Sequence, residues 1–231
     1  MPGAKHIVAL GGRGEPAGPL NRFLLGLSGR ERPRACFVPT ATGDSPDAIV
    51  LFYEDFPASL CEPSHLTLFG VPRAGIREHL LAQDVIVVAG GNTGNMLAVW
   101  RVHAVDAVLR EAWEAGVVLT GWSAGGICWF EGAVTDSFGP DLAPLDDGLG
   151  FLTGSFCPHY DTEAERRSTY HRLVSEGLPG GLAADDAVGL HFAGTELAEA
   201  VTERSGAQAY RVEAGDDGTA RETPLPVRVL T

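Results

Sequence analysis

The chain has 231 residues, of which 45% are hydrophobic and 20% are charged, so it is long enough to bury a sizeable core. Its formal net charge of −13 at pH 7 excludes partners such as nucleic acid and anionic membranes, because both would be repelled. The composition is that of a soluble globular protein.

Short apolar runs alternate with longer helical patterns in the first half of the chain. The predicted elements, in order, are strand 6–10, helix 21–27, strand 34–39, helix 48–56, strand 65–69, helix 76–81, strand 84–89, helix 94–115 and strand 117–120. This alternation predicts an α/β fold, with a mostly parallel central sheet and helices on both faces. In such sheets, functional residues collect at the carboxyl ends of the strands.

Beyond residue 130 the strand signals become shorter. They lie at 154–157, 187–192, 199–202, 209–212 and 227–230, and one helix at 163–174 interrupts them. The pattern predicts antiparallel strands that complete the C-terminal edge of the fold. Because no repeat and no long linker is present, we expect residues 1–231 to form a single domain.

The expected location is cytoplasmic. Residues 1–6 pass directly into an apolar strand, without the roughly 7–15-residue apolar core of a secretory leader. No apolar run approaches the roughly 20 residues of a membrane helix. The four cysteines are far apart and form no C-x-x-C pair, which indicates neither a zinc site nor a disulfide framework and fits a reducing compartment.

A G-x-S-x-G motif, Gly121-Trp122-Ser123-Ala124-Gly125, directly follows the buried strand 117–120. Between a strand and a helix, this motif is typical of a nucleophile elbow, a sharp turn that exposes the serine hydroxyl. The helix that follows offers free N–H groups near the reacting oxygen. We therefore predict Ser123 as a nucleophile and the Ala124 N–H as an oxyanion donor; a tight turn without chemistry is the alternative.

A second glycine-rich segment, GGNTGN at 90–95, follows strand 84–89. Its glycines allow backbone N–H groups to point into a crevice, so it is the expected source of a second oxyanion donor. The G-x-G-x-x-G spacing of a dinucleotide-binding loop is absent. A helix entry that needs glycine only for its geometry is the alternative.

His159 is the predicted general base, because it follows a strand and lies downstream of the serine in the chain. His191 is the main rival among the other histidines. The acid that orients the imidazole cannot be chosen from spacing alone. The candidates are Asp136, Asp185 and Asp186.

Three of these segments together resemble the peptidase E family of α-aspartyl dipeptidases, of which cyanophycinase is a distant relative. They are the GGNT segment at 90–93, the serine motif at 121–125 and Pro158-His159 about 35 residues later. The resemblance implies a class I glutamine amidotransferase-like fold with serine in place of the cysteine nucleophile. It also implies hydrolysis of dipeptides that begin with aspartate, with no metal or organic cofactor required.

Carried over residue by residue, the resemblance implies a serine peptidase triad of Ser123, His159 and Asp136. The oxyanion hole would consist of the Gly91 and Ala124 N–H groups. Some sites of this type take the acid from a later strand, which here implies Asp185 or Asp186.

The substrate carboxylate requires a cation, since the protein as a whole is acidic. Arg166 or Arg167, in the helical stretch after the histidine, could bind it by a bidentate fork. Asn92 is a further substrate-binding candidate. An ordinary amphipathic helix with Glu163 paired to Arg167 is the alternative.

Other functions stay open at this point. The same triad could act on other acidic peptides, isopeptides or esters, or the domain could be a non-catalytic ligand-binding relative of the amidotransferases. Metal binding by His159, Asp161 and Glu163 is a weaker alternative, because no second cluster completes the ligand shell. The expected partner is a small peptide substrate, without nucleic acid or membrane, and a homodimer is compatible with the sequence.

Overall fold

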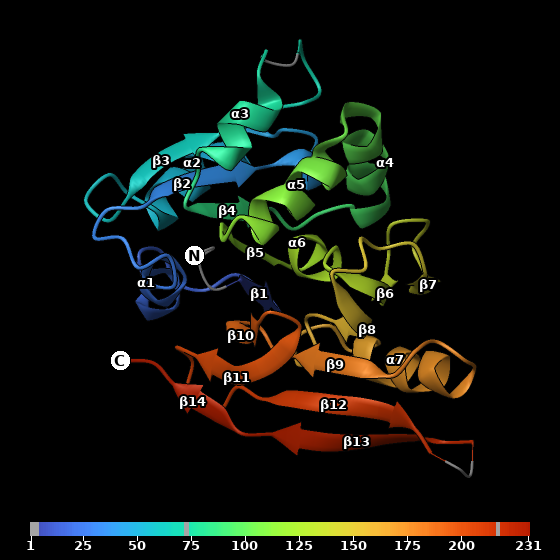
Figure 1. Cartoon of the computed structure of the whole chain (residues 1–231). Helices are drawn as coiled ribbons and strands as arrows, with labels where there is room; N and C mark the ends of the chain where they lie inside the picture. The colour runs from blue at the N-terminus through green and yellow to red at the C-terminus, as the bar shows by residue number, and fades with distance from the viewer. Residues whose placement is uncertain (1–4, 72–73, 216–217) are drawn as a thin grey trace.

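The computed structural model describes residues 5–71, 74–215 and 218–231, and Figure 1 shows its elements. In chain order, the first half forms β1 (His6–Leu10), α1 (Pro19–Gly26), β2 (Arg34–Val38), the 3₁₀ turn η1 (Thr40–Thr42), α2 (Pro46–Asp55), β3 (Glu62–His65), α3 (Ile76–Leu81), β4 (Val85–Val88), α4 (Thr93–His103), α5 (Val105–Glu114), β5 (Val118–Trp122) and α6 (Ala124–Ile127).

The second half contains most of the strands. Its elements are β6 (Phe130–Thr135), β7 (Ala143–Leu145), β8 (Leu152–Cys157), α7 (Arg166–Ser175), β9 (Gly181–Ala184), β10 (Val188–Ala193), β11 (Glu196–Thr202), β12 (Ala209–Ala214), β13 (Ala220–Leu225) and β14 (Val227–Val229).

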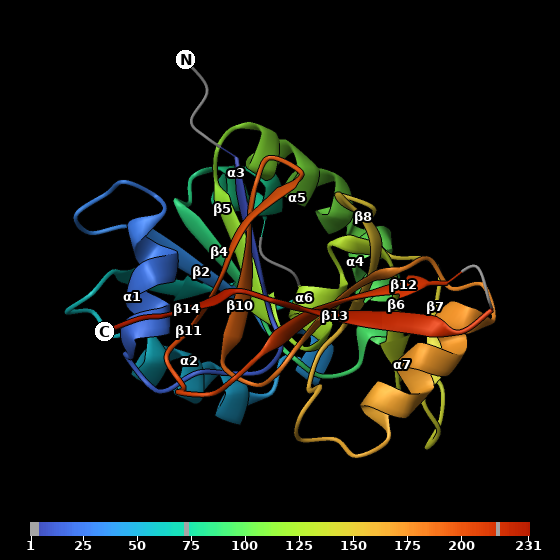
Figure 2. The same ribbon diagram turned by 90° about the horizontal axis from the view of Figure 1, so that it is seen from below.

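An eight-stranded sheet has the order β14-β11-β10-β1-β5-β4-β2-β3. The run from β1 to β3 is parallel, while β10 and β11 are antiparallel additions beside β1. Alternate strand residues face opposite sides: Ile7 and Val88 pack with α3, α4 and α5, whereas Val8 and Val87 pack with α1 and α2. Figure 2 shows these helices on the two sides of the sheet. The predicted α/β class is therefore confirmed.

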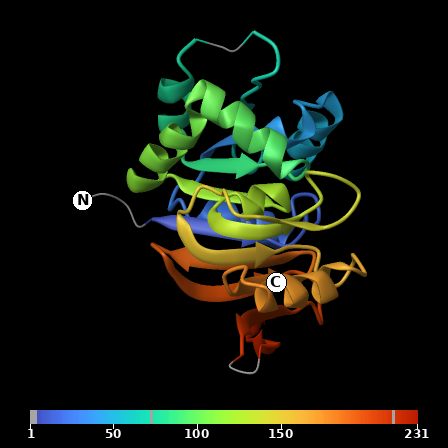
Figure 3. The ribbon, with the colours of Figure 1, turned by 90° about the vertical axis from the view of Figure 1, so that its right-hand side faces the viewer.

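A six-stranded sheet has the order β13-β12-β9-β8-β6-β7. Its central strands β6, β8 and β9 are parallel, and β7, β12 and β13 are antiparallel. Helix α7 packs on this sheet through Tyr170, Leu173 and Val174. In Figure 3, α7 and the last strands, coloured orange to red, lie in the lower half of the molecule. The predicted antiparallel edge holds for β10 and β11, but the separate sheet was not predicted, because short strand signals do not specify which strands pair.

Two local elements differ from the sequence prediction. The strand expected at 65–69 is β3 at Glu62–His65, an edge strand without an apolar pattern. The single helix expected at 94–115 is interrupted at Ala104, whose φ of +55° ends α4 before α5 begins. An alanine carries no sequence signal for such a break, since left-handed residues are usually glycine or asparagine.

Within the described ranges, no helix combines the length and the apolar character that crossing a bilayer requires. The absence of a secretory leader was inferred from residues 1–6, and residues 1–4 of that segment lie outside the described part of the chain.

Candidate active site

Ser123 occupies a strained turn between β5 and α6, with φ 53° and ψ −117°. A non-glycine residue in this region costs about 1–3 kcal/mol, and such strain clusters at functional positions. Ala124 begins α6, so its N–H has no acceptor within the helix. The turn therefore has the nucleophile-elbow geometry that the motif predicts.

Gly121 and Gly125 are required because the β4 backbone passes close to this turn. A Cβ atom at Gly121 would lie 2.5 Å from the carbonyl oxygen of Val88, and one at Gly125 would lie 2.3 Å from the same oxygen. Since that oxygen belongs to a buried strand, it cannot move aside cheaply. Both glycines of the motif are thus explained by packing.

His159 and Asp186 form a hydrogen-bonded pair. The Nδ1 atom of His159 lies 2.6 Å from Oδ1 of Asp186, in the turn between β9 and β10. A carboxylate at this distance favours the tautomer with hydrogen on Nδ1, which leaves Nε2 with a free lone pair. Asp186 Oδ2 also accepts a hydrogen bond from Thr162 Oγ1 at 3.1 Å. The pair can therefore act as an oriented base.

The end of β1 brings the serine and the histidine together. The backbone N–H of Ser123 donates to the Leu10 carbonyl at 3.1 Å, and that of His159 donates to the Gly11 carbonyl at 3.2 Å. Consecutive Cα atoms are about 3.8 Å apart, so these two residues flank one short stretch of backbone. Among the described residues no hydrogen bond joins their side chains, and hydrogen bonds of this kind often form only when a substrate is bound.

Gly11 and Gly12 are site residues that the sequence analysis missed. A Cβ atom at Gly12 would lie 2.0 Å from Oδ1 of Asp186, and one at Gly11 would lie 2.2 Å from the carbonyl oxygen of Asp185. The available signal was a Gly-Gly pair directly after the first strand. The two glycines leave room for the carboxylate that contacts the histidine.

The carboxylate that contacts His159 is Asp186, not the expected Asp136. Asp185 is buried, and its Oδ2 accepts a hydrogen bond from the Gln208 N–H at 2.8 Å instead. The strands β6 and β9 flank β8 in parallel, so Asp136 after β6 and Asp186 after β9 both reach the edge where β8 delivers His159. The sequence could not distinguish these two neighbours.

His191, the rival histidine, lies away from this edge. It pairs with Val8 in the middle of β1, and its Nε2 lies 3.0 Å from Nδ1 of His6. Burial is the main cause that lowers the pKa of His191, which keeps the ring neutral. It is a core histidine in this fold.

A cavity of about 240 Å³ opens beside the serine, and six residues line it: Gly91, Asn92, Ser123, Asp136, Glu163 and Arg166. Gly91 has a φ of +136°, and a Cβ atom there would lie 2.3 Å from the Ala41 carbonyl oxygen. The cavity is smaller than the roughly 300–1,000 Å³ of drug-sized sites. It suits a single small residue rather than a long peptide.

Asn92 and Ser137 hold the Asp136 segment in place. Asn92 Oδ1 accepts from the Asn95 N–H at 2.8 Å, and its Nδ2 donates to the Ser137 carbonyl at 3.0 Å. Ser137 Oγ accepts from the first N–H groups of α4, at 2.9 and 3.2 Å. Asn92, a predicted substrate-binding residue, thus lines the cavity while its amide caps α4. The sequence analysis did not identify Ser137.

Of the two predicted arginines, only Arg166 lines the cavity. It is 2% exposed, and it donates to Glu163 Oε2 at 2.6 Å and to the Val134 carbonyl at 2.9 Å. Arg167 instead forms an ion pair with Glu222 on β13. The alternative arrangement, in which Glu163 pairs with Arg167, is not seen, because Glu163 forms an ion pair with Arg166.

The alternative metal ligands have separate partners. His159 contacts Asp186, Asp161 contacts Arg204, and Glu163 contacts Arg166. No cluster of His, Cys, Asp or Glu able to hold a metal ion occurs in the part of the chain that the structure describes.

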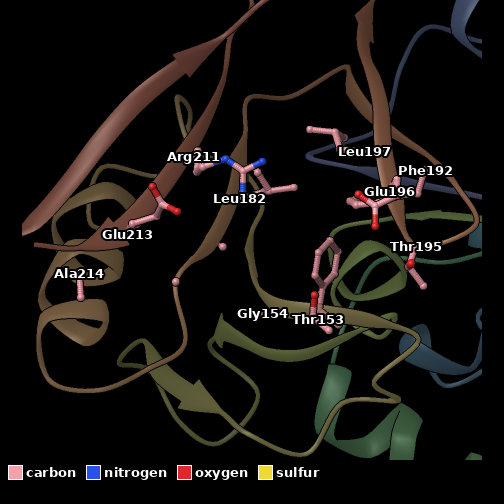
Figure 4. Close-up of a pocket in the computed structure, with 13 residues that line it drawn as sticks. Thr153, Gly154, Leu182, Phe192, Thr195, Glu196, Leu197, Arg211, Glu213 and Ala214 are labelled. Atoms are coloured by element: carbon pink, nitrogen blue, oxygen red, sulfur yellow. The ribbon is translucent and has the colours of Figure 1, made fainter.

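A larger cavity, of about 550 Å³, lies at the opposite edge of the sheets. Figure 4 shows the side chains of Arg211, Glu196 and Glu213 around it. Its lining includes Gly154 and Gly181, which lie at the starts of β8 and β9, whereas His159 and Asp186 follow the ends of those strands. Its lining contains neither Ser123 nor His159 nor Asp186, so the smaller cavity beside Ser123 is the candidate active site.

Known proteins are similar to this chain in sequence and in fold. The model of Peptidase family S51 matches residues 7–200. "Uncharacterized peptidase YgaJ" of Bacillus subtilis (strain 168) is 50% identical over 231 residues, which cover 98% of this chain and 99% of the relative.

Two solved structures have a similar fold. A peptidase from an acI-B1 Actinobacterium superposes with a TM-score of 0.67 at 15% identity, and the match covers 99% of this chain and 97% of that one. A protein named after peptidase E, from Listeria monocytogenes EGD-e, has a TM-score of 0.58 at 16% identity, covering 96% and 100%.

Proposed function

Because the chain belongs to Peptidase family S51, we propose that it is a serine peptidase that hydrolyses dipeptides with an N-terminal aspartate. The proposed triad is Ser123, His159 and Asp186. The observation that carries the substrate class is the small cavity beside Ser123, which combines one buried arginine with two carboxylates.

The reaction follows from the orientation of His159. Its Nε2 takes the proton of Ser123 as Oγ attacks the peptide carbonyl, and then protonates the leaving amine. The N–H groups of Gly91 and Ala124 stabilise the oxyanion, each worth about 10²–10³ in kcat. Water, activated by the same imidazole, then hydrolyses the acyl-enzyme.

The cavity supports recognition of a free N-terminal aspartate. The Arg166 guanidinium has three N–H donors left after its bonds to Glu163 and Val134, and it can bind the side-chain carboxylate of the substrate. Asp136, which does not contact His159, can bind the α-ammonium group. Asp136 thus takes a substrate-binding role in the proposal, in place of the triad role expected from the sequence.

The test is a panel of substrates with one matched change each. We expect cleavage of Asp-Leu, and at least about 100-fold lower kcat/KM for Asn-Leu and for N-acetyl-Asp-Leu, which remove the carboxylate and the ammonium charge respectively. Ser123→Ala should abolish turnover of every substrate. Hydrolysis confined to nitrophenyl esters, or equal cleavage of Asp-Leu and N-acetyl-Asp-Leu, would reject the proposal.

A further inference from the structure

His159 has a backbone conformation that its neighbours must hold. Its φ is +54°, in the left-handed region that is costly for a residue with a side chain. The next residue, Tyr160, is 4% exposed, and its N–H donates to the Ala184 carbonyl at 3.2 Å. The position of Tyr160 therefore determines that of the histidine before it.

The Tyr160 hydroxyl is fixed by a residue from the C-terminal hairpin. It donates to Oε2 of Glu222 at 2.5 Å, and that oxygen also lies 3.0 Å from Nε2 of His171 on α7. Burial, together with the neighbouring carboxylate, raises the pKa of Tyr160 well above its usual range, so the hydroxyl stays protonated as a donor.

The other oxygen of Glu222 pairs with Arg167, the residue after Arg166. The Arg167 guanidinium also lies over the rings of Tyr160 and Tyr210, at 5.3 and 5.0 Å from their centroids. Partial burial alone would raise the pKa of Glu222, but hydrogen bonds from Tyr160, Arg167 and His171 outweigh it and lower the pKa overall. Glu222 is therefore ionised at neutral pH.

One carboxylate thus holds the chain neighbours of two active-site residues. Tyr160 adjoins the proposed base, and Arg167 adjoins the arginine that lines the cavity beside Ser123. We propose that Glu222 is a positioning residue that sets the imidazole of His159 and the guanidinium of Arg166 relative to Ser123. Glu222 lies beyond residues 7–200, so the hairpin that the family model does not cover supplies part of the active-site support. The inference rests on the proposed function.

The test is Glu222→Gln, which keeps the size of the side chain and removes its charge. We expect kcat for Asp-Leu to fall about 10–100-fold, as for a small misplacement of a catalytic group, and KM to rise. The labelling rate of Ser123 by a small fluorophosphonate should fall in parallel, because labelling needs the base but not the acidic substrate. Glu213→Gln on the paired strand β12 is the matched control and should behave as wild type.

Single variants separate the contact of Glu222 with Tyr160 from its contact with Arg167. Tyr160→Phe should lower kcat and the labelling rate without changing KM, whereas Arg167→Gln should raise KM for Asp-Leu more than it lowers kcat. Circular dichroism and assays well below the Tm exclude unfolding as the cause. Wild-type kcat, KM and labelling in folded Glu222→Gln, or equal losses in Glu213→Gln, would overturn the inference. If the wild type is labelled but does not cleave Asp-Leu, the proposed function fails, and slower labelling of Glu222→Gln would still support the positioning role.

Discussion

The turn that carries Ser123 and the loops that carry His159 and Asp186 lie on either side of the end of β1, but different forces hold them. The serine turn contacts uncharged backbone, including the Val88 and Leu10 carbonyls. The loops around the histidine are joined by charged groups: Asp161 accepts from the Asp186 N–H at 3.0 Å and pairs with Arg204. Packing against the backbone therefore positions the proposed nucleophile, whereas hydrogen bonds and ion pairs of charged side chains contribute to positioning the proposed base and acid.

The largest expected effect, a loss of kcat, tests the loops that charged groups hold around His159 and Asp186. Asp186→Asn should reduce kcat on Asp-Leu by about 10⁴-fold. The amide that replaces the carboxylate can neither stabilise the imidazolium nor select the tautomer with hydrogen on Nδ1. Steady-state kinetics, with circular dichroism to verify folding, measure the effect. Asp136→Asn serves as the comparison and should mainly raise KM. A collapse of kcat in Asp136→Asn alone would restore Asp136 as the acid.

The next effect, a loss of stability, tests the close packing of the Ser123 turn against β4. In Gly125→Ala, the new Cβ atom would lie 2.3 Å from the Val88 oxygen, so either β4 or the serine turn must shift. We expect the free energy of unfolding to fall by about 3 kcal/mol, measured by urea denaturation, with loss of Ser123 labelling. Gly26→Ala in α1 is the control: its Cβ meets open space and should stabilise the helix by up to about 1 kcal/mol. Equal stability of the two variants would contradict the packing argument.

The smallest effect concerns pH. Burial alone would raise the pKa of Asp161, but Arg204 and the Asp186 N–H lower it overall below its ordinary value. A carboxyl whose folded pKa is depressed contributes stability above its unfolded pKa of about 3.9 and loses it as the pH falls through the folded value. Asp161→Asn should therefore lower the free energy of unfolding by about 0.5–1 kcal/mol at pH 7.

The same substitution should have a smaller effect near pH 2, because the wild-type carboxyl is increasingly protonated as the pH falls through its depressed folded pKa. Thermal unfolding of wild type and Asp161→Asn at the two pH values measures the difference, which corresponds to about 2 °C in Tm at pH 7. A Tm difference that persists unchanged at pH 2 would show that charge does not hold this loop.

The comparison also explains what the sequence could predict. The serine turn depends on residues that adjoin it in the chain, so the motif at 121–125 and the preceding apolar strand were sufficient to locate it. The inner parallel strands of the first sheet, β1, β2, β4 and β5, could similarly be predicted, because they are buried on both faces and appear as largely apolar runs.

The carboxylate that contacts His159 could not be predicted from the sequence, for a physical reason. Asp136 and Asp186 follow two different strands that flank β8, and only the pairing of those strands decides which carboxylate meets His159. The contact between Glu222 and Tyr160 spans 62 positions and depends on how the hairpin packs against α7. Contacts of this kind leave no periodic trace in a single sequence.

The carbonyl groups of Leu10 and Gly11 are consecutive, and this limits where insertions and deletions can occur in natural relatives of the chain. These two carbonyl oxygens accept hydrogen bonds from the backbone N–H groups of Ser123 and His159. One additional residue between them would move the imidazole away from the hydroxyl by about 3.3–3.6 Å. Insertions and deletions should therefore be tolerated on the distant surface turns and excluded from residues 10–12. The length of chain at the end of β1 thus sets the distance between the proposed nucleophile and the proposed base.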